Sequence, residues 1–114
     1  MIRIYHNPQC PKSRAGLHYL ETKGIPFEVV EYLKNPLTQA DLEKLMVKLH
    51  KKPSEVIRTQ EEYYKKNLKG KNFNDHEWIR IILKNPKLLQ RPVVEAQHKA
   101  VIGDPVENID VLIK

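Results

Sequence analysis

The sequence predicts an α/β fold in which a β-α-β unit and a β-β-α unit flank a helical block. Two observations and one packing rule lead to this prediction. Short runs of β-branched and aromatic residues recur near both ends of the chain. Amphipathic runs preceded by a proline or a capping residue indicate helices between and after these strands. A β-α-β unit with a right-handed crossover, followed by a hairpin and a helix, forms a compact two-layer sandwich.

The N-terminal part of the chain is predicted to form the β-α-β unit. Residues 2–5 have the composition of a short strand. Residues 6–9 form a loop, because they contain the breaker pair Asn-Pro. A proline suits the first position of a helix, so a helix over 11–23 is expected, with Gly24 as its stop. Residues 27–32 then indicate a second strand.

The middle of the chain is predicted to be helical. Thr38 and Asp41 resemble a capping box, which marks a helix start. The apolar residues that follow lie on one helix face: Leu42, Leu45, Met46 and Leu49. A short helix is expected over 53–58, and partial helicity is expected over 59–72.

The last third of the chain is predicted to contain a helix, a hairpin and a final helix. Residue 74 or 75 caps the first of these helices, and the Asn-Pro pair at 85–86 ends it. Its buried side is expected to comprise Trp78, Ile79, Ile81, Ile82 and Leu83. Two apolar runs, 93–95 and 99–102, indicate a hairpin around a polar turn. Asp104-Pro105 is expected to start the last helix.

Length and charge limit the possible classes of protein. The 114 residues suffice for one domain, and 40% hydrophobic with 30% charged residues is a globular composition. The net charge of +6 equals the excess in residues 44–71, where nine basic residues meet three acidic ones. We interpret the eight lysines there as a solvated face, with steering of an anion or acidic partner as the alternative. A nucleic-acid partner is not expected, since no recognised motif is present.

Several classes of site and location are excluded or disfavoured. A single cysteine, Cys10, permits neither an intramolecular disulfide nor a cysteine-rich zinc site. No metal site is expected, because the histidines lack ligand spacing and four of them (His18, His50, His76 and His98) are interpreted as surface residues. No apolar run reaches the ~20 residues of a membrane helix, and no signal peptide can be identified. A cytoplasmic protein without a membrane partner is expected.

Cys10 lies where a strand-to-helix turn would make a thiol reactive. The positive end of a helix dipole, with Lys12 and Arg14 in its first turn, favours the thiolate and lowers the pKa of the cysteine. Ser13 stands at the resolving position of a Cys-x-x-Cys spacing, where it can donate a hydrogen bond but cannot form a disulfide. The alternative is a buried, inert cysteine. His6 either tunes the thiolate or orders the loop.

These residues together resemble the active-site loop of the glutaredoxin-linked arsenate reductases (the ArsC family) and their Spx relatives. The likeness covers essentially the whole chain through five segments: YHNPQC with Ser13 and Arg14, EYLKNP at 31–36, IRT at 57–59, NPKLLQRPVV at 85–94 and VIG at 101–103. The resemblance implies one thioredoxin-like domain, 1–114, with a helical insertion at about 36–88.

The resemblance also implies roles for individual residues. Cys10 corresponds to the family's nucleophile, and Arg58 and Arg91 correspond to its oxyanion-binding arginines. Pro92 corresponds to the family's cis-proline, although spacing alone is equally consistent with an ordinary edge-strand proline. Where the family commonly has a third arginine, this chain has Asp104, which would repel an arsenate dianion.

The function that the resemblance implies is reduction of an oxyanion, arsenate, by a monomeric enzyme that binds no cofactor. Glutathione would be the co-substrate and glutaredoxin the partner, since one cysteine cannot resolve its own intermediate. Two alternatives remain open. One is an Spx-like, redox-responsive regulator that binds the RNA polymerase alpha subunit. The other is a monothiol, glutathione-dependent oxidoreductase that acts on mixed disulfides.

Overall fold

The structure is a computed structural model that describes residues 1–113 and comprises two compact units. Residues 1–35 and 91–113 form the first unit, and residues 36–90 form the second. A single domain with an insertion at about 36–88 stays a prediction. None of the helices within residues 1–113 has the length and apolar character that crossing a bilayer requires.

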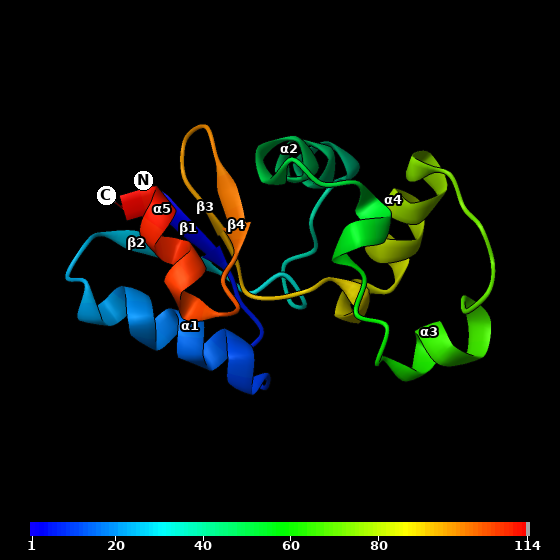
Figure 1. The fold of residues 1–114 in the computed structure, drawn as a ribbon, viewed down its shortest axis with the longest axis horizontal. Coiled ribbons are helices and arrows are strands. Elements are labelled where there is room, and N and C mark those ends of the chain that lie inside the picture. The colour runs from blue at the N-terminus through cyan, green and yellow to red at the C-terminus, as the bar shows by residue number, and fades with distance from the viewer. Residues whose placement is uncertain (114) are drawn as a thin grey trace. The chain divides into compact units, whose positions relative to one another are not determined.

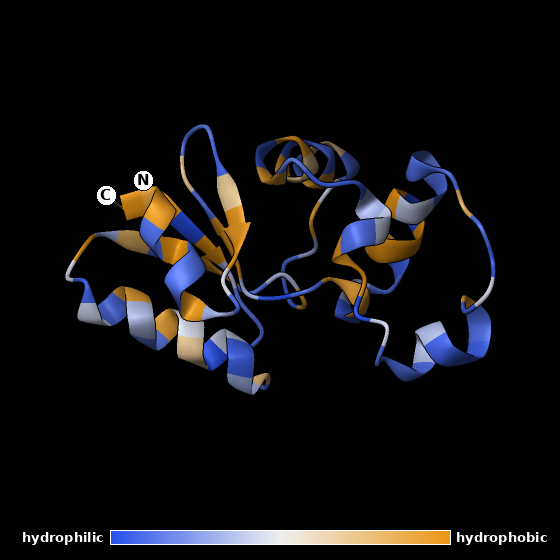
Figure 2. Cartoon of the chain, in the orientation of Figure 1, coloured by the Kyte–Doolittle hydropathy of each residue, from blue (hydrophilic) through white to orange (hydrophobic). Residues whose placement is uncertain are grey.

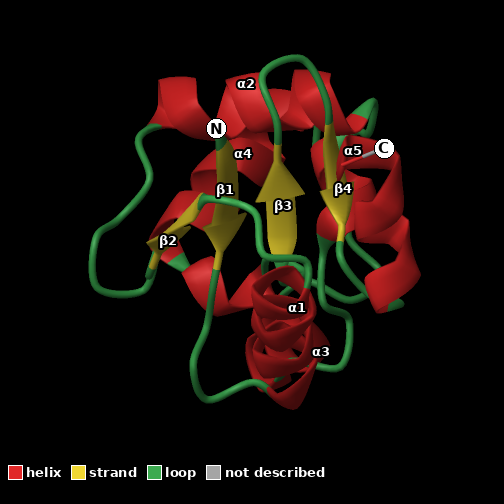
Figure 3. Cartoon of the chain, turned by 90° about the vertical axis from the view of Figure 1, so that its left-hand side faces the viewer, coloured by secondary structure: helices red, strands yellow, loops and turns green. Residues whose placement is uncertain are grey.

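The first unit contains a four-stranded mixed sheet with the order β2-β1-β3-β4 (Figure 3). β1 (Ile2–Tyr5) pairs in parallel with β2 (Phe27–Val30) and antiparallel with β3 (Val93–Glu95). β4 (Ala100–Ile102) completes the β3–β4 hairpin. This topology confirms the predicted α/β fold, with its β-α-β unit and its C-terminal hairpin.

Helices cover one face of this sheet (Figure 1). α1 (Pro11–Thr22) and the C-terminal segment of η3 (Val106–Ile109) and α5 (Asp110–Ile113) pack there. Their core consists of four fully buried side chains: Ile4, Leu20, Val94 and Ile109. Burying each such aliphatic side chain stabilises the fold by roughly 1.5–3 kcal/mol. The core therefore joins the two terminal halves of the chain.

The second unit is helical, as predicted. It contains α2 (Gln39–Leu49), η1 (Pro53–Val56), α3 (Glu62–Asn67), α4 (Asp75–Lys84) and η2 (Pro86–Leu88). Thr38 and Asn74 both close reciprocal capping boxes at the helix starts. All four apolar residues predicted for the inner face of α2 are buried. Figure 2 shows α3 in hydrophilic colours, consistent with a helix that buries none of its residues.

Some predicted boundaries and faces were wrong. The second strand ends at Val30 instead of residue 32, because the carbonyl of Glu31 accepts hydrogen bonds from the next turn's backbone N–H groups. The short helix predicted over 53–58 is a 3₁₀ turn that ends at Val56, since Ile57 forms a β-bridge with Leu89. On α4, Ile81 and Leu83 are only half-buried.

The final predicted helix also differs from the observed one. Its first turn is of 3₁₀ type and begins at Val106, after Asp104-Pro105, and the α-helical turn follows from Asp110. Ile109 in this segment is fully buried. The sequence thus predicted a helical segment here but not its 3₁₀ start.

Candidate active site

Cys10 is the N-cap residue of α1, with Pro11 at the first helical position. Its backbone N–H donates to the carbonyl of Asn7 at 3.0 Å, and its own carbonyl accepts the N–H of Arg14 at 3.0 Å. The side chain is buried. The preceding loop and the helix therefore hold the sulfur at the helix N-terminus, where unpaired N–H groups and the positive end of the dipole lie.

The surroundings of Cys10 favour the thiolate. Burial raises the pKa of the thiol. Several interactions outweigh that effect and leave the pKa of the thiol below its usual value. They are hydrogen bonds from the backbone of Ser13, the side chain of Arg91 and the backbone of Lys12, together with the positive charge of Arg91. A lowered pKa is the property that makes a cysteine nucleophilic at neutral pH. A reactive Cys10 stays a prediction, and the lowered pKa is consistent with it.

Ser13 and His6 form a buried polar cluster beside the cysteine loop. The Ser13 hydroxyl lies 2.7 Å from Nδ1 of His6 and accepts the backbone N–H of Asn7 at 2.9 Å. Burial lowers the pKa of His6 and outweighs the nearby Glu31 carboxylate, so the neutral imidazole is favoured. His6 thus orders the loop through Ser13, while the backbone of Ser13 bonds the thiol.

Arg91 and Pro92 enter β3 next to this loop. Both are buried, and the peptide bond between them is cis. The Pro92 ring packs against Gly16 of α1 and against Gly103. The N–H of Gly103 also donates to the Pro92 carbonyl at 2.8 Å. These contacts hold the backbone that carries Arg91, whose side chain bonds Cys10.

Lys12 and Arg14, the two cations in the first turn of α1, each have a partner. The Lys12 ammonium lies 3.1 Å from the Asp104 carboxylate. The Arg14 guanidinium donates to the carbonyl of Pro8 at 3.0 Å, across the loop. Arg14 therefore braces the loop, and Lys12 forms an ion pair at the edge of the site.

Arg58 lies in the second unit, whereas Cys10 and Arg91 lie in the first. Its Nε donates to Glu61 at 3.1 Å, and its backbone N–H donates to the carbonyl of Leu88 at 2.7 Å. Both contacts are internal to the second unit and hold the arginine at the end of η1. A role for Arg58 opposite Cys10 stays a prediction.

The lysines of residues 44–71 and the histidines other than His6 were predicted to lie at the surface. Of the eight lysines in residues 44–71, all are exposed except Lys48, which is half-buried. The histidines other than His6 are exposed. Within residues 1–113, no group of three or more histidine, cysteine or acidic side chains is arranged to hold a metal ion.

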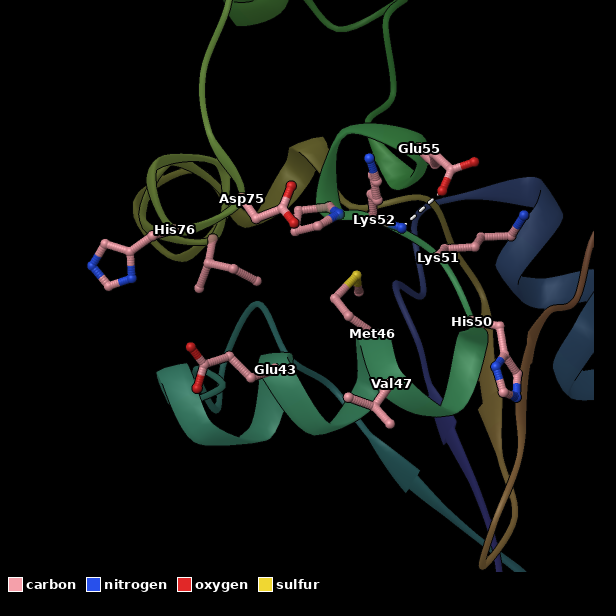
Figure 4. Close-up of a pocket in the computed structure, with 11 residues that line it drawn as sticks. Glu43, Met46, Val47, His50, Lys51, Lys52, Glu55, Asp75 and His76 are labelled. Carbon is pink, nitrogen blue, oxygen red and sulfur yellow. Dashed lines mark hydrogen bonds between the residues drawn. The ribbon is translucent and has the colours of Figure 1, made fainter.

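The second unit contains a cavity of about 730 Å³ between α2, η1 and α4 (Figure 4). Apolar side chains of Met46, Val47 and Ile79 line it, together with acidic, basic and histidine side chains. In Figure 4, Met46 lies near its middle. None of the predicted site residues lines this cavity.

Two features of the site were missed by the sequence analysis. The Lys12–Asp104 ion pair joins residues far apart in the chain, so local spacing carries no signal for it. The bond between Ser13 and His6 joins residues seven apart across a loop of irregular backbone. A periodicity argument could not find it, although both residues had been singled out individually.

Comparison with known proteins places this geometry in a family. The ArsC family model matches residues 5–112. An arsenate reductase of Neisseria meningitidis serogroup A is 40% identical over 98% of this chain and 97% of its own. The uncharacterized Escherichia coli protein YfgD is 40% identical over 95% of this chain and 92% of its own.

Solved structures agree with the sequence comparisons. An arsenate reductase from Vibrio cholerae superposes with a TM-score of 0.90, at 34% identity over 97% of this chain and 96% of its own. The fold is therefore the thioredoxin-like fold of the arsenate reductases, as the sequence predicted. With a matching family model, full-length relatives and the same fold, this chain belongs to the ArsC family.

Proposed function

We propose that this protein is a thiol oxidoreductase of the arsenate reductase type, in which the Cys10 thiolate attacks an oxyanion, arsenate. The observation that carries the proposal is the thiol itself. Its pKa is lowered although burial raises it, because the backbone of Ser13, the side chain of the buried Arg91 and the backbone of Lys12 favour the thiolate. The relatives named arsenate reductase support the reaction class.

The attack forms a sulfur–arsenic bond, and one arsenate oxygen leaves as water after protonation. Arg91 supports this step in two ways. Its guanidinium stabilises the thiolate and can bind an oxyanion through two parallel hydrogen bonds. We propose that Arg58 supplies a second guanidinium to the same anion.

Reduction of arsenic(V) to arsenic(III) needs two electrons, which one cysteine cannot supply by forming an internal disulfide. Two external thiols therefore provide them and leave joined as a disulfide, while Cys10 returns to the thiolate. We propose glutathione and glutaredoxin as the thiol donors. Such thiols are abundant in the reducing cytoplasm, where we place the protein, acting as a monomer without a bound cofactor.

The direct test is steady-state reduction of arsenate with glutathione and glutaredoxin, measured for the wild type and for Cys10→Ser. The wild type should turn over, and the variant should be inactive, because serine has no nucleophilic thiolate at neutral pH. Full activity of Cys10→Ser would refute the nucleophile. Absence of wild-type activity under saturating thiols would refute arsenate as the substrate.

The two arginines can be tested separately. Arg91→Met and Arg58→Met should each lower kcat/KM by about 10²–10³-fold, the cost of one lost oxyanion donor. Arg80→Met is the matched control, because Arg80 is an exposed arginine of α4 in the same unit as Arg58. A kcat/KM of Arg58→Met that equals that of Arg80→Met would show that Arg58 does not bind the oxyanion.

Asp104 favours a second candidate function, a glutathione-dependent monothiol oxidoreductase. A carboxylate near the helix start that carries Cys10 opposes an arsenate dianion but not an uncharged disulfide bond. In this reaction the thiolate attacks the glutathione sulfur of a mixed disulfide and the substrate thiolate leaves. A second glutathione then frees Cys10 as oxidised glutathione forms. Comparing arsenate with a glutathionylated peptide in the same assay separates the two functions.

A further inference from the structure

The ion pair between Lys12 and Asp104 lies at the first turn of α1, two residues after Cys10. Its two charged atoms are 3.1 Å apart, and the side chains are 53% and 42% exposed. Such a half-exposed pair contributes little to folding stability. The main consequence of this ion pair is therefore its effect on the electrostatic field around the thiolate.

The position of the carboxylate is set by the same proline that follows Arg91. Gly103 donates its N–H to the Pro92 carbonyl at 2.8 Å and packs against the Pro92 ring, and Asp104 is the next residue. At the other end of the pair, Lys12 lies in the first turn of the helix that Cys10 caps, and its backbone favours the Cys10 thiolate. Both members of the ion pair are thus held by the backbone that builds the site.

The pair changes the charge that an approaching reagent meets. The ammonium of Lys12 would attract an anion toward Cys10, but the adjacent carboxylate cancels it. Arg91 remains as the cation bonded to the sulfur. In the high dielectric of an exposed site, a nearby unit charge changes a rate by about threefold for each charge on the reagent.

We propose that Asp104, by neutralising Lys12, weakens the attraction of the Cys10 site for anionic electrophiles, so that negative charge on the electrophile accelerates its reaction with Cys10 less than it would beside an unpaired Lys12. This inference rests on one part of the proposed function, the role of Cys10 as the nucleophile. It narrows the substrate class without depending on arsenate. Asp104 does not touch the sulfur in this assignment, and it acts by placing charge.

The test compares the alkylation of Cys10 by iodoacetate and by iodoacetamide, which have similar size and differ by one negative charge. In both reactions the thiolate attacks the CH₂ carbon, a C–S bond forms and iodide leaves. Both rates scale with the fraction of thiolate. Their ratio therefore reports the local charge and not the pKa of the cysteine.

We expect Asp104→Asn to raise the iodoacetate-to-iodoacetamide ratio about threefold at low salt, and Lys12→Gln to lower it by a similar factor. The double variant should return toward the wild type. High salt should bring all ratios together, because it screens exposed charges. Glu21→Gln is the matched control, since it removes an exposed carboxylate that lies about 16 Å from Cys10 along the helix axis of α1.

Equal ratios for wild type, Asp104→Asn and Glu21→Gln at low salt would overturn the inference. The result is independent of arsenate reduction. A protein without reductase activity whose ratio still shifts in Asp104→Asn would refute the proposed function and support the charge selection. In a protein that does reduce arsenate, unchanged ratios would refute the charge selection alone.

Discussion

Gly16 of α1 allows the helix to approach Pro92 closely, and replacing it with alanine should displace the site. A methyl group at this position would lie 2.5 Å from Cγ of Pro92, with Cβ and Cδ of the ring at 3.5 and 3.7 Å. The proline ring is rigid and buried, and it also packs against Gly103. Relief of the overlap therefore requires movement of α1 or of the Arg91–Pro92 backbone.

Two opposing effects decide the stability of Gly16→Ala. Alanine is favoured over glycine in a helix by ~0.8–1 kcal/mol. Overpacking a filled site costs ~1–3 kcal/mol, and an overlap with a ring atom belongs at the upper end. We expect a net loss of about 1–2 kcal/mol, measured by urea unfolding. Alkylation of Cys10 should also slow, because the displaced backbone carries Arg91.

Ala15→Gly calibrates the helix effect, because Ala15 is exposed on the same helix. It should cost ~1 kcal/mol through helix propensity and leave the alkylation rate of Cys10 unchanged. The reasoning fails if Gly16→Ala is as stable as the wild type, or more stable, and alkylates at the wild-type rate. The helix would then tolerate the methyl group without moving the site.

Three further predictions concern buried polar groups. Ser13→Ala should cost ~1–3 kcal/mol in urea unfolding and slow the alkylation of Cys10, because the buried N–H of Asn7 loses its acceptor; an unchanged stability would contradict this. The lowered pKa of Cys10 means that thiolate formation stabilises the folded state above the ordinary thiol pKa, ~8.5. That stabilisation is lost as pH falls through the lowered pKa, so Cys10→Ala should reduce the pH dependence of the unfolding free energy across this window. Burial and a hydrogen bond to Glu95 raise the pKa of Tyr5 to about 12, so an absorbance titration should show a late tyrosine step that Tyr5→Phe removes.

The elements that were predicted well are those with local causes. The capping boxes at Thr38 and Asn74 satisfy backbone N–H groups within one turn, so their spacing is visible in the chain. The end of β2 at Val30 depends instead on which carbonyls the following turn uses. The 3₁₀ start of the last helix depends on packing around Ile109. Those details arise from contacts that no spacing rule contains.

The site residues also differ in whether their causes are local in the sequence. A reactive Cys10 could be predicted, because a helix N-terminus lowers a thiol pKa through groups adjacent in sequence. The contribution of Arg91 could not be derived from spacing, since 81 residues separate it from the cysteine, and only the resemblance indicated it. The pairing of Lys12 with Asp104 had neither source, because the two residues are far apart in the chain and the resemblance implies no contact between them.

Strand register explains why these distant residues meet. Tyr5 pairs with Val93, so the loop that leaves β1 toward Cys10 starts beside the residues that enter β3. Val93 in turn pairs with Ile102, which brings the residues after β4 to the same end of the sheet. One row of pairings therefore gathers the thiol, Arg91 and Asp104 from three loops. Since a register slip of one residue turns every side chain of a strand to the opposite face, the sheet constrains the chemistry as strictly as the cysteine loop does.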